Sequence, residues 1–161
     1  MRHEVPAARV YEMAATKEFQ EQKCRDAGAT CFVVTVTERD AGATVVTRRT
    51  LPTAGFPALL HRFVPTGVTS TETITWAAAG PGGARIADLA VAFHGLPAAL
   101  HGQIRLLPDG RDRATIVVDA EFRAHVPVIG RKVEGFAAPI ILGVIDAEER
   151  TGRAWAAAGG W

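Results

Sequence analysis

The sequence has little of what metal, redox and nucleic-acid sites usually require. Only 2 of its 161 residues are cysteine. Cys24 and Cys31 fit no zinc or thiol-redox spacing, so we expect both to be small buried thiols. Basic and acidic residues number 18 and 17, which gives a net charge of +1. The sequence therefore lacks the excess of basic residues that is typical of a nucleic-acid binder. We therefore expect no metal, no cofactor and no nucleic-acid partner.

Long apolar runs are also absent. The most apolar uncharged stretch, residues 89–104, contains His94, Gly95 and Pro97 and is shorter than the roughly 20 residues of a membrane-spanning helix. The opening Met-Arg-His-Glu-Val-Pro lacks the apolar core of a secretion signal. We therefore expect a cytoplasmic protein without stable membrane insertion. Hydrophobic residues make up 48% and charged residues 22%, which suits one globular domain over residues 1–161.

Period-two alternation is the strongest pattern in the sequence. It is clearest at residues 114–126, where Ile116 and Phe122 share a parity against Asp119 and Glu121. Such alternation is typical of antiparallel strands with one buried face and one solvated face. The predicted strands cover residues 31–38, 44–50, 68–77, 85–93, 100–106 and 114–126.

Helical patterns lie at the two ends of the chain. Residues 8–27 predict a short helical opening, in which Thr16 is a candidate N-cap for a second helix and Gly28 ends that helix. Residues 129–157 predict a long closing helix. Its predicted apolar stripe consists of Ile129, Val133, Phe136, Ile140, Val144, Ala147 and Ala154. The mixed charges on its other face, including Glu148 and Glu149, are expected to be solvated.

These elements predict an α+β architecture. An antiparallel sheet of about six or seven amphipathic strands has one apolar face to cover, and the closing helix, about 40 Å long, is the only predicted element of sufficient length. Because sheets twist and coil, a curved sheet around one straight helix leaves space. That space is either filled by large side chains or open as a cavity.

Three stretches carry a family resemblance. They are Leu-Pro at 51–52 with Phe-Pro-Ala-Leu-Leu-His-Arg-Phe-Val-Pro at 56–65, Thr-Glu-Thr-Ile-Thr-Trp at 71–76, and Val-Pro-Val-Ile-Gly-Arg-Lys-Val-Glu at 126–134. With this element order, the chain resembles the START-like (SRPBCC) helix-grip superfamily of the birch-pollen allergen and aromatic polyketide cyclases. It most resembles an uncharacterised branch from high-GC bacteria. The resemblance implies a helix-grip fold over nearly the whole chain, and its motifs carry no known chemistry.

The candidate ligand site is the apolar space between sheet and closing helix. Its predicted lining consists of Phe32, Val34, Trp76, Leu89, Val91, Phe93, Ile104, Ile116, Val118, Phe122, Phe136 and Ile140. Burying about 300 Å² of apolar ligand surface contributes about 7 kcal/mol, and association costs reduce the affinity to micromolar at best without polar anchors. Ordinary core packing is the alternative interpretation of these residues.

Glu72 is the one titratable candidate, because it shares strand parity with Ile74 and Trp76. If that face is inward, a lone carboxylate enters the cavity, and desolvation raises its pKa, as suits a ligand anchor or general base. If that face is outward, Glu72 is a solvated residue near a strand end. The alternation does not decide, because the opposite parity is all threonine. The five histidines show no metal-ligand spacing.

Three functions remain open. The leading hypothesis is a non-enzymatic binding or carrier protein for a small hydrophobic molecule, lipid-like or polycyclic, with no catalytic residue. The second is an enzyme of the polyketide cyclase or aromatase kind, which needs a second inward titratable group within hydrogen-bond reach of Glu72. The third is a protein-interaction domain with a filled core, in which the edge beside a short first strand pairs with another chain, as in a homodimer.

Overall fold

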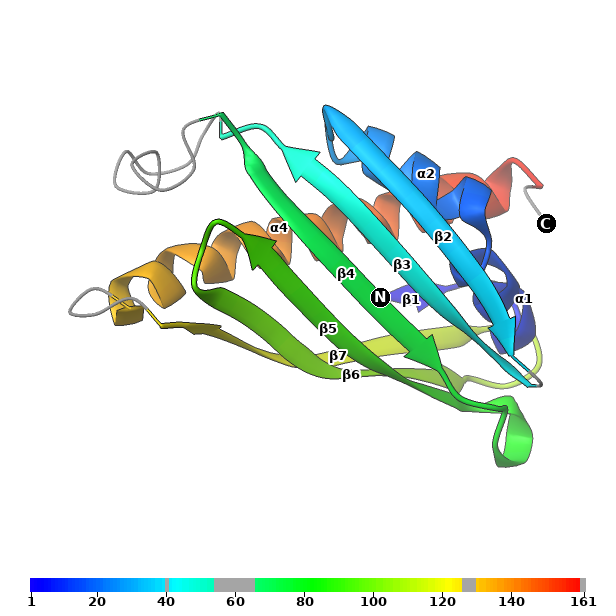
Figure 1. Ribbon diagram of the computed structural model, residues 1–161. Helices are drawn as coiled ribbons and strands as arrows, with labels where there is room; N and C mark the ends of the chain where they lie inside the picture. Colours follow the sequence, from blue (N-terminus) through cyan, green and yellow to red (C-terminus); the bar gives the residue numbers. More distant parts are fainter. Residues whose placement is uncertain (40, 54–65, 126–129, 160–161) are drawn as a thin grey trace.

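A computed structural model describes residues 1–39, 41–53, 66–125 and 130–159 (Figure 1). Seven antiparallel strands form one sheet in the order β1-β7-β6-β5-β4-β3-β2. The strands are β1 (Arg2–His3), β2 (Cys31–Arg39), β3 (Gly42–Leu51), β4 (Val68–Trp76), β5 (Arg85–His94), β6 (Ala98–Pro108) and β7 (Ala114–Ala124). The predicted fold class is confirmed: a curved antiparallel sheet with a long C-terminal helix.

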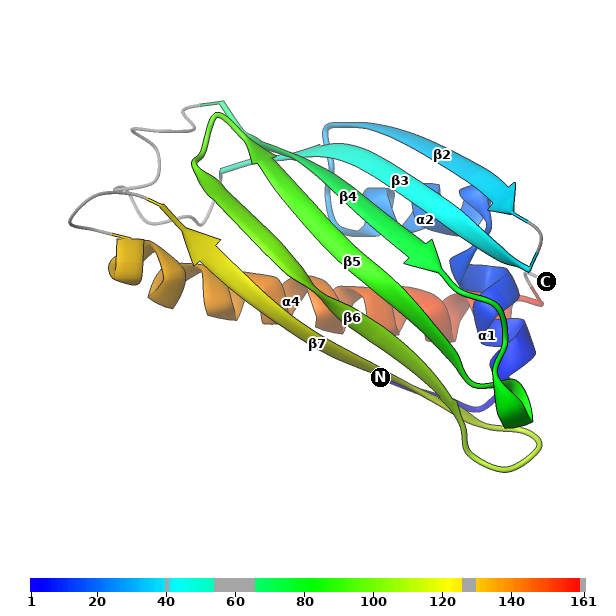
Figure 2. The same ribbon diagram turned by 60° about the horizontal axis from the view of Figure 1, so that its bottom comes forward.

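Within the described ranges, three α-helices lie on the inner side of this sheet. They are α1 (Ala7–Ala14), α2 (Lys17–Asp26) and α4 (Gly130–Ala157), and a 3-10 turn, η1 (Pro81–Gly83), joins β4 to β5. The sheet curves around α4, while α1 and α2 gather near the C-terminal half of α4 (Figures 1 and 2). The arrangement is compatible with a helix-grip fold. No described helix is long and apolar enough to cross a membrane.

The strand registers define the inner face of the sheet. Each strand pairs continuously with its neighbour, so side chains line up in rows across it. One row consists of Val34, Thr47, Glu72, Val91, Leu100 and Phe122, and the next begins with Phe32, Arg49, Ser70 and Phe93. Glu72 and all ten strand residues of the predicted ligand site therefore share one face.

The α1 end of the inner face is filled by a hydrophobic core. Val10 and Met13 of α1 belong to one buried cluster with Trp76, Leu106 and Ile116 of the sheet. Tyr11 packs edge-to-face on Trp76 with ring centroids 5.8 Å apart. The backbone amide of Ile116 donates to the carbonyl of Met1, which extends the short β1 along β7. These contacts fix the N-terminal segment and α1 over this end of the sheet.

Two local predictions are confirmed only in part. Thr16 occupies the N-cap position of α2, but its hydroxyl donates to the carbonyl of Met13 at 2.9 Å and caps no amide. Cys24 is buried as expected, whereas Cys31 is exposed. Cys31 is the first residue of the edge strand β2 and shares the outward parity of Val33, so no element covers it.

The predicted stripe of α4 is only partly inward. Val133 is buried, but so are Thr151 and Gly152, whereas Ala154 is exposed. Ile141 and Trp155 pack against the core. The stripe was misplaced because alanine is small enough for either face, while the inward threonine and glycine carry no apolar signal.

Candidate functional site

Glu72 lies inside a buried set of ion pairs. Lys23 Nζ is 3.1 Å from Oε1 of Glu72 and 3.3 Å from Oε1 of Glu148, and Arg49 Nη2 is 3.5 Å from Oε2 of Glu72. Lys23, Arg49 and Glu72 are only 2%, 6% and 9% exposed. Four side chains from α2, β3, β4 and α4 thus form what we call the buried charge cluster: Lys23, Arg49, Glu72 and Glu148.

The charges in this cluster stabilise one another. Burial raises the pKa of the Glu72 carboxyl, but the attraction of Lys23 and Arg49 and the Lys23 hydrogen bond outweigh burial and hold that pKa below its usual value. Burial lowers the pKa of Lys23, and the two glutamates reverse the effect and raise it. The expected rise in the pKa of Glu72 is therefore wrong, because its carboxylate is not alone.

This electrostatic arrangement bears on the enzyme hypothesis. Lys23 is the second inward titratable group that the hypothesis needed, within hydrogen-bond reach of Glu72. However, each partner moves the pKa of the other away from neutrality, and general acid–base catalysis is most efficient when the pKa lies near the working pH. The cluster therefore holds fixed charges rather than an exchangeable proton.

Several hydrogen-bonding groups on the β3 side of the cluster are unused. Arg49 Nε and Nη1 and Thr47 Oγ1 are buried without a hydrogen-bond partner in the described part of the chain. The thiol of Cys24 is a weak acceptor that interacts with the guanidinium and helps to raise the pKa of Arg49. Burial raises the pKa of the Cys24 thiol itself. Because most buried polar atoms in proteins have a partner, this side has capacity for a further acceptor.

An incompletely covered apolar region adjoins the cluster. The row of Arg49 and Ser70 continues into Phe93 on β5, and Phe93 packs edge-to-face on Phe122 with centroids 5.5 Å apart. Val91, Phe93, Ala98 and Phe122 are all only partly buried, and we call them the apolar end. In Figures 1 and 2 this part of the sheet faces the first half of α4 and no other described helix.

The structure divides the predicted ligand-site residues into two groups. The buried group consists of Val34, Trp76, Leu89, Ile104 and Ile116. The partly exposed group consists of Phe32, Val91, Phe93, Val118, Phe122 and Ile140. The side chain of Phe136 lies outside the described residues. Arg25 stacks over the Phe32 ring at 5.4 Å, so Phe32 has a cationic neighbour at the β2 edge.

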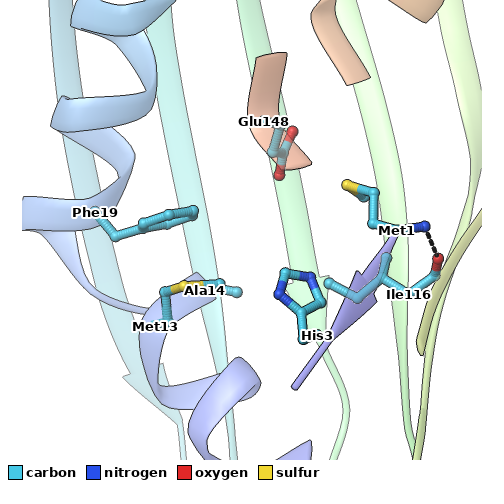
Figure 3. Close-up of a pocket in the computed structure, with 7 residues that line it drawn as sticks. All are labelled: Met1, His3, Met13, Ala14, Phe19, Ile116 and Glu148. Carbon is cyan, nitrogen blue, oxygen red and sulfur yellow. Dashed lines mark hydrogen bonds between the residues drawn. The ribbon is translucent and has the colours of Figure 1, made fainter. Parts of the chain in front are cut away.

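A small cavity lies at the α1 end (Figure 3). Its volume of about 10 Å³ is near the minimum for one water molecule. The lining residues are Met1, His3, Met13, Ala14, Phe19, Ile116 and Glu148. Figure 3 shows Glu148 and His3 approaching the cavity from opposite sides. Of the predicted ligand-site residues, only Ile116 lines it.

His3 is the buried titratable group at this cavity. Its side chain is 4% exposed, and Nε2 has no hydrogen-bond partner among the described residues. Burial and the neighbouring N-terminal ammonium lower the pKa of His3 more than Glu149 raises it. His3 is therefore held neutral in the core. No group of three or more potential metal ligands occurs in the described ranges.

Lys23, Arg49 and Glu148 were not predicted from the sequence as site residues. Lys23 follows Phe19 by four residues and so lies on the buried side of α2, and Arg49 shares strand parity with the buried Val45. Glu148 was assigned to the solvated face of the closing helix, but it lies seven residues after Ile141 on the side that meets the core. Helical and strand spacing counted from these apolar residues places all three on buried sides, although it does not show that they meet Glu72.

Residues 1–156 match a family described as a protein of unknown function (DUF2505). A search of curated proteins finds no match. The matched residues include both the buried charge cluster and the apolar end. The match therefore concerns the sheet and α4 together.

Proposed function

The chain belongs to this family of unknown function (DUF2505), and we propose that it binds a small hydrophobic molecule between the apolar end and the first half of α4. One observation carries the proposal: Val91, Phe93 and Phe122 lie on the inner face of a curved sheet yet stay partly exposed. A ligand that covers these side chains gains the free energy of removing apolar surface from water.

The opposite end of the inner face is unsuitable for such a ligand. There α1 and the N-terminal segment pack into the core cluster, and the cavity of about 10 Å³ has room for a water molecule only. A lipid-like molecule at that end would have to displace α1. We therefore propose the apolar end, beside the buried charge cluster, as the binding region.

We also propose that the protein is a cytoplasmic START-like (SRPBCC) carrier or sensor rather than an enzyme. The element order supports this classification, with short helices before the sheet and a long helix after it. The ion pairing of Glu72 with Lys23 and Arg49 supports a non-catalytic role, because it leaves the carboxylate poorly suited to accept a proton.

A substitution that fills the apolar end tests the proposal. Ala98 pairs with Ala124 on the inner face and is partly buried, whereas Ala92 on the neighbouring strand is exposed on the outer face. We expect Ala98→Trp to weaken binding of the neutral dye Nile red by about tenfold or more, since an indole occupies the space that the ligand needs. Ala92→Trp is the matched control and should leave binding unchanged.

Fluorescence titration with the purified variants measures both affinities, and circular dichroism confirms that each variant is folded. Nile red binding of equal strength in wild type, Ala98→Trp and Ala92→Trp would show that the dye binds elsewhere. No binding by the wild type would also reject the proposal.

A second candidate is pairing of two copies through β2. This strand forms one edge of the sheet, and Val33 on it is 62% exposed, the type of edge that associates with another strand. Light scattering over a range of concentrations measures the oligomeric state. A dimer that Val33→Lys dissociates supports this candidate, and a monomer at every concentration rejects it.

A further inference from the structure

We propose that the ligand carries a carboxylate head group that pairs with Arg49 while its hydrocarbon part covers the apolar end. This inference rests on the proposed function and adds the chemical class of the ligand. It depends on three observations. The two cations of the buried charge cluster are not neutralised to the same extent, and Arg49 has donors without a partner. A row of paired residues also connects Arg49 to Phe93 across the sheet.

The two cations of the cluster are not equally neutralised. Lys23 contacts two carboxylates, at 3.1 Å and 3.3 Å. Among the described residues Arg49 has one ion pair, with the second oxygen of Glu72 at 3.5 Å, which is longer than an ordinary N–H···O hydrogen bond. Its other neighbour is the Cys24 thiol, a weak acceptor without a full charge. The cluster is therefore dipolar, with its positive end at Arg49 and its negative end at the partly exposed Glu148.

Arg49 also has donors without a hydrogen-bond partner. Its Nε and Nη1 atoms are buried without a hydrogen-bond partner in the described ranges, and a buried unpartnered donor on a charged group is costly. A carboxylate accepts several hydrogen bonds and donates none, and guanidinium–carboxylate bonds are charge-assisted and strong. A carboxylate would use both the free donors and the unbalanced charge.

The sheet register connects this cation to the apolar end. Arg49, Ser70 and Phe93 are directly paired on β3, β4 and β5. Since neighbouring strands are about 4.8 Å apart, Arg49 and Phe93 are separated by about 10 Å across the sheet, and β3 and β7 by about 19 Å. A medium-length acyl chain with a terminal carboxylate spans the shorter distance, from Arg49 to Phe93, and extends beyond Phe93 toward β7. Such a molecule would place its head at Arg49 and its chain over Phe93 and Phe122.

Calorimetric binding of dodecanoate and dodecanol, which share one hydrocarbon chain, tests the inference. We expect wild-type protein to bind dodecanoate more tightly than dodecanol by about tenfold or more. Arg49→Met should abolish this preference and leave dodecanol binding intact, while Arg49→Lys should keep part of it. The matched control is Arg48→Met, since Arg48 is exposed on the outer face of the same strand.

Arg49→Met leaves Glu72 with fewer partners, so a second variant guards against misfolding. The double substitution Arg49→Met with Glu72→Gln removes the two opposite charges together, and it should likewise bind both ligands equally. Retained binding of dodecanol, with an unchanged circular dichroism spectrum, shows that the apolar end is intact.

The outcomes separate the inference from the proposed function. Loss of the acid preference in the Arg49 variants, but not in Arg48→Met, supports the inference. Equal wild-type affinity for dodecanoate and dodecanol, tighter binding of dodecylamine, or an acid preference that survives Arg49→Met overturns it while the proposed function stands. If none of these ligands binds to the wild type, the proposed function fails as well.

Discussion

Lys23 is the residue on which the buried charge cluster depends. It is 2% exposed and is the partner of both Glu72 and Glu148. Taking charges out of water is costly unless each has a partner, and removing one partner leaves an unpaired charge in the interior. The cluster therefore ties α2, the sheet and α4 together in a way that a single substitution can disrupt.

We expect Lys23→Met to lower the free energy of unfolding by about 3–5 kcal/mol, because Glu72 loses its shortest ion pair inside the protein. Lys17→Met is the control on the same helix, since Lys17 is exposed and lies 3.8 Å from Glu21. The control should cost less than about 1 kcal/mol. Urea unfolding measures both. Losses of similar size in the two variants would contradict the stabilising role of the cluster.

Acid should destabilise the protein in two stages. The pKa of His3 lies below its ordinary 6.5 in the folded protein, so the unfolded state binds the proton more readily, and stability falls as the pH drops below 6.5. The pKa of Glu72 lies below its ordinary 4.5. The stability from its ion pairs is therefore complete above pH 4.5 and is lost as the pH falls through the lower folded value.

Urea unfolding at a series of pH values measures these stages. His3→Gln removes the titration of His3. The free energy of unfolding of this variant should change little just below pH 6.5, and its loss of stability below pH 4.5 should match that of the wild type. A curve for His3→Gln that is parallel to the wild-type curve through the first stage would show that His3 does not cause it.

At the scale of elements, the strands could be predicted from sequence and the inner face of α4 could not. Period-two alternation depends on which face of the sheet is buried, so a strand such as β7 has a readable pattern. The closing helix carries alanine on several faces, and its inward Thr151 and Gly152 have no apolar signal. The residue range of α4 was therefore predicted better than the side of the helix that faces the sheet.

This difference between strands and helices also explains why Glu72 was predicted as a site residue and its partners were not. The alternation placed Glu72 with Ile74 and Trp76, and the registers put all three on the inner face. Its partners Lys23 and Glu148 lie on helices, and their approach to Glu72 depends on tertiary packing that no local spacing specifies. The sequence therefore predicted the carboxylate but not the charges that lower its pKa.

Close packing of β1 under α4 gives a prediction for Gly152. An added Cβ there would lie 3.0 Å from Cε1 of His3 and 3.5 Å from Cε of Met13, whereas one at Gly143 on the same helix would meet nothing within 4 Å. We expect Gly152→Val to lower the free energy of unfolding by about 1–3 kcal/mol, because it forces the core apart.

Gly143→Val is the matched control, since valine has a slightly higher helix propensity than glycine. It should leave the free energy of unfolding unchanged or raise it by a few tenths of a kcal/mol. Thermal or urea unfolding compares the two variants. A Gly152→Val protein as stable as Gly143→Val would show that β1 and α1 are not packed closely against α4.

On the scale of the whole molecule, the inner face of the sheet has two dissimilar regions. At one end α1, the N-terminal segment and Trp155 of α4 complete a packed core. At the other end Phe93 and Phe122 pack on each other but stay partly exposed under the first half of α4. The curvature that lets the sheet surround α4 thus leaves, beside a packed core, a partly exposed apolar surface, and this is where we propose that the ligand binds.

Nuclear magnetic resonance with a nitroxide-labelled fatty acid tests the ligand position most directly, because the label broadens the backbone amide signals of residues near it. We expect broadening at the apolar end, at Val91, Phe93, Ala98 and Phe122, and at Val133 and Ile141 on α4. Broadening centred on the outer face of the sheet around Val33 or Ile86, or no broadening at any amide, would contradict it.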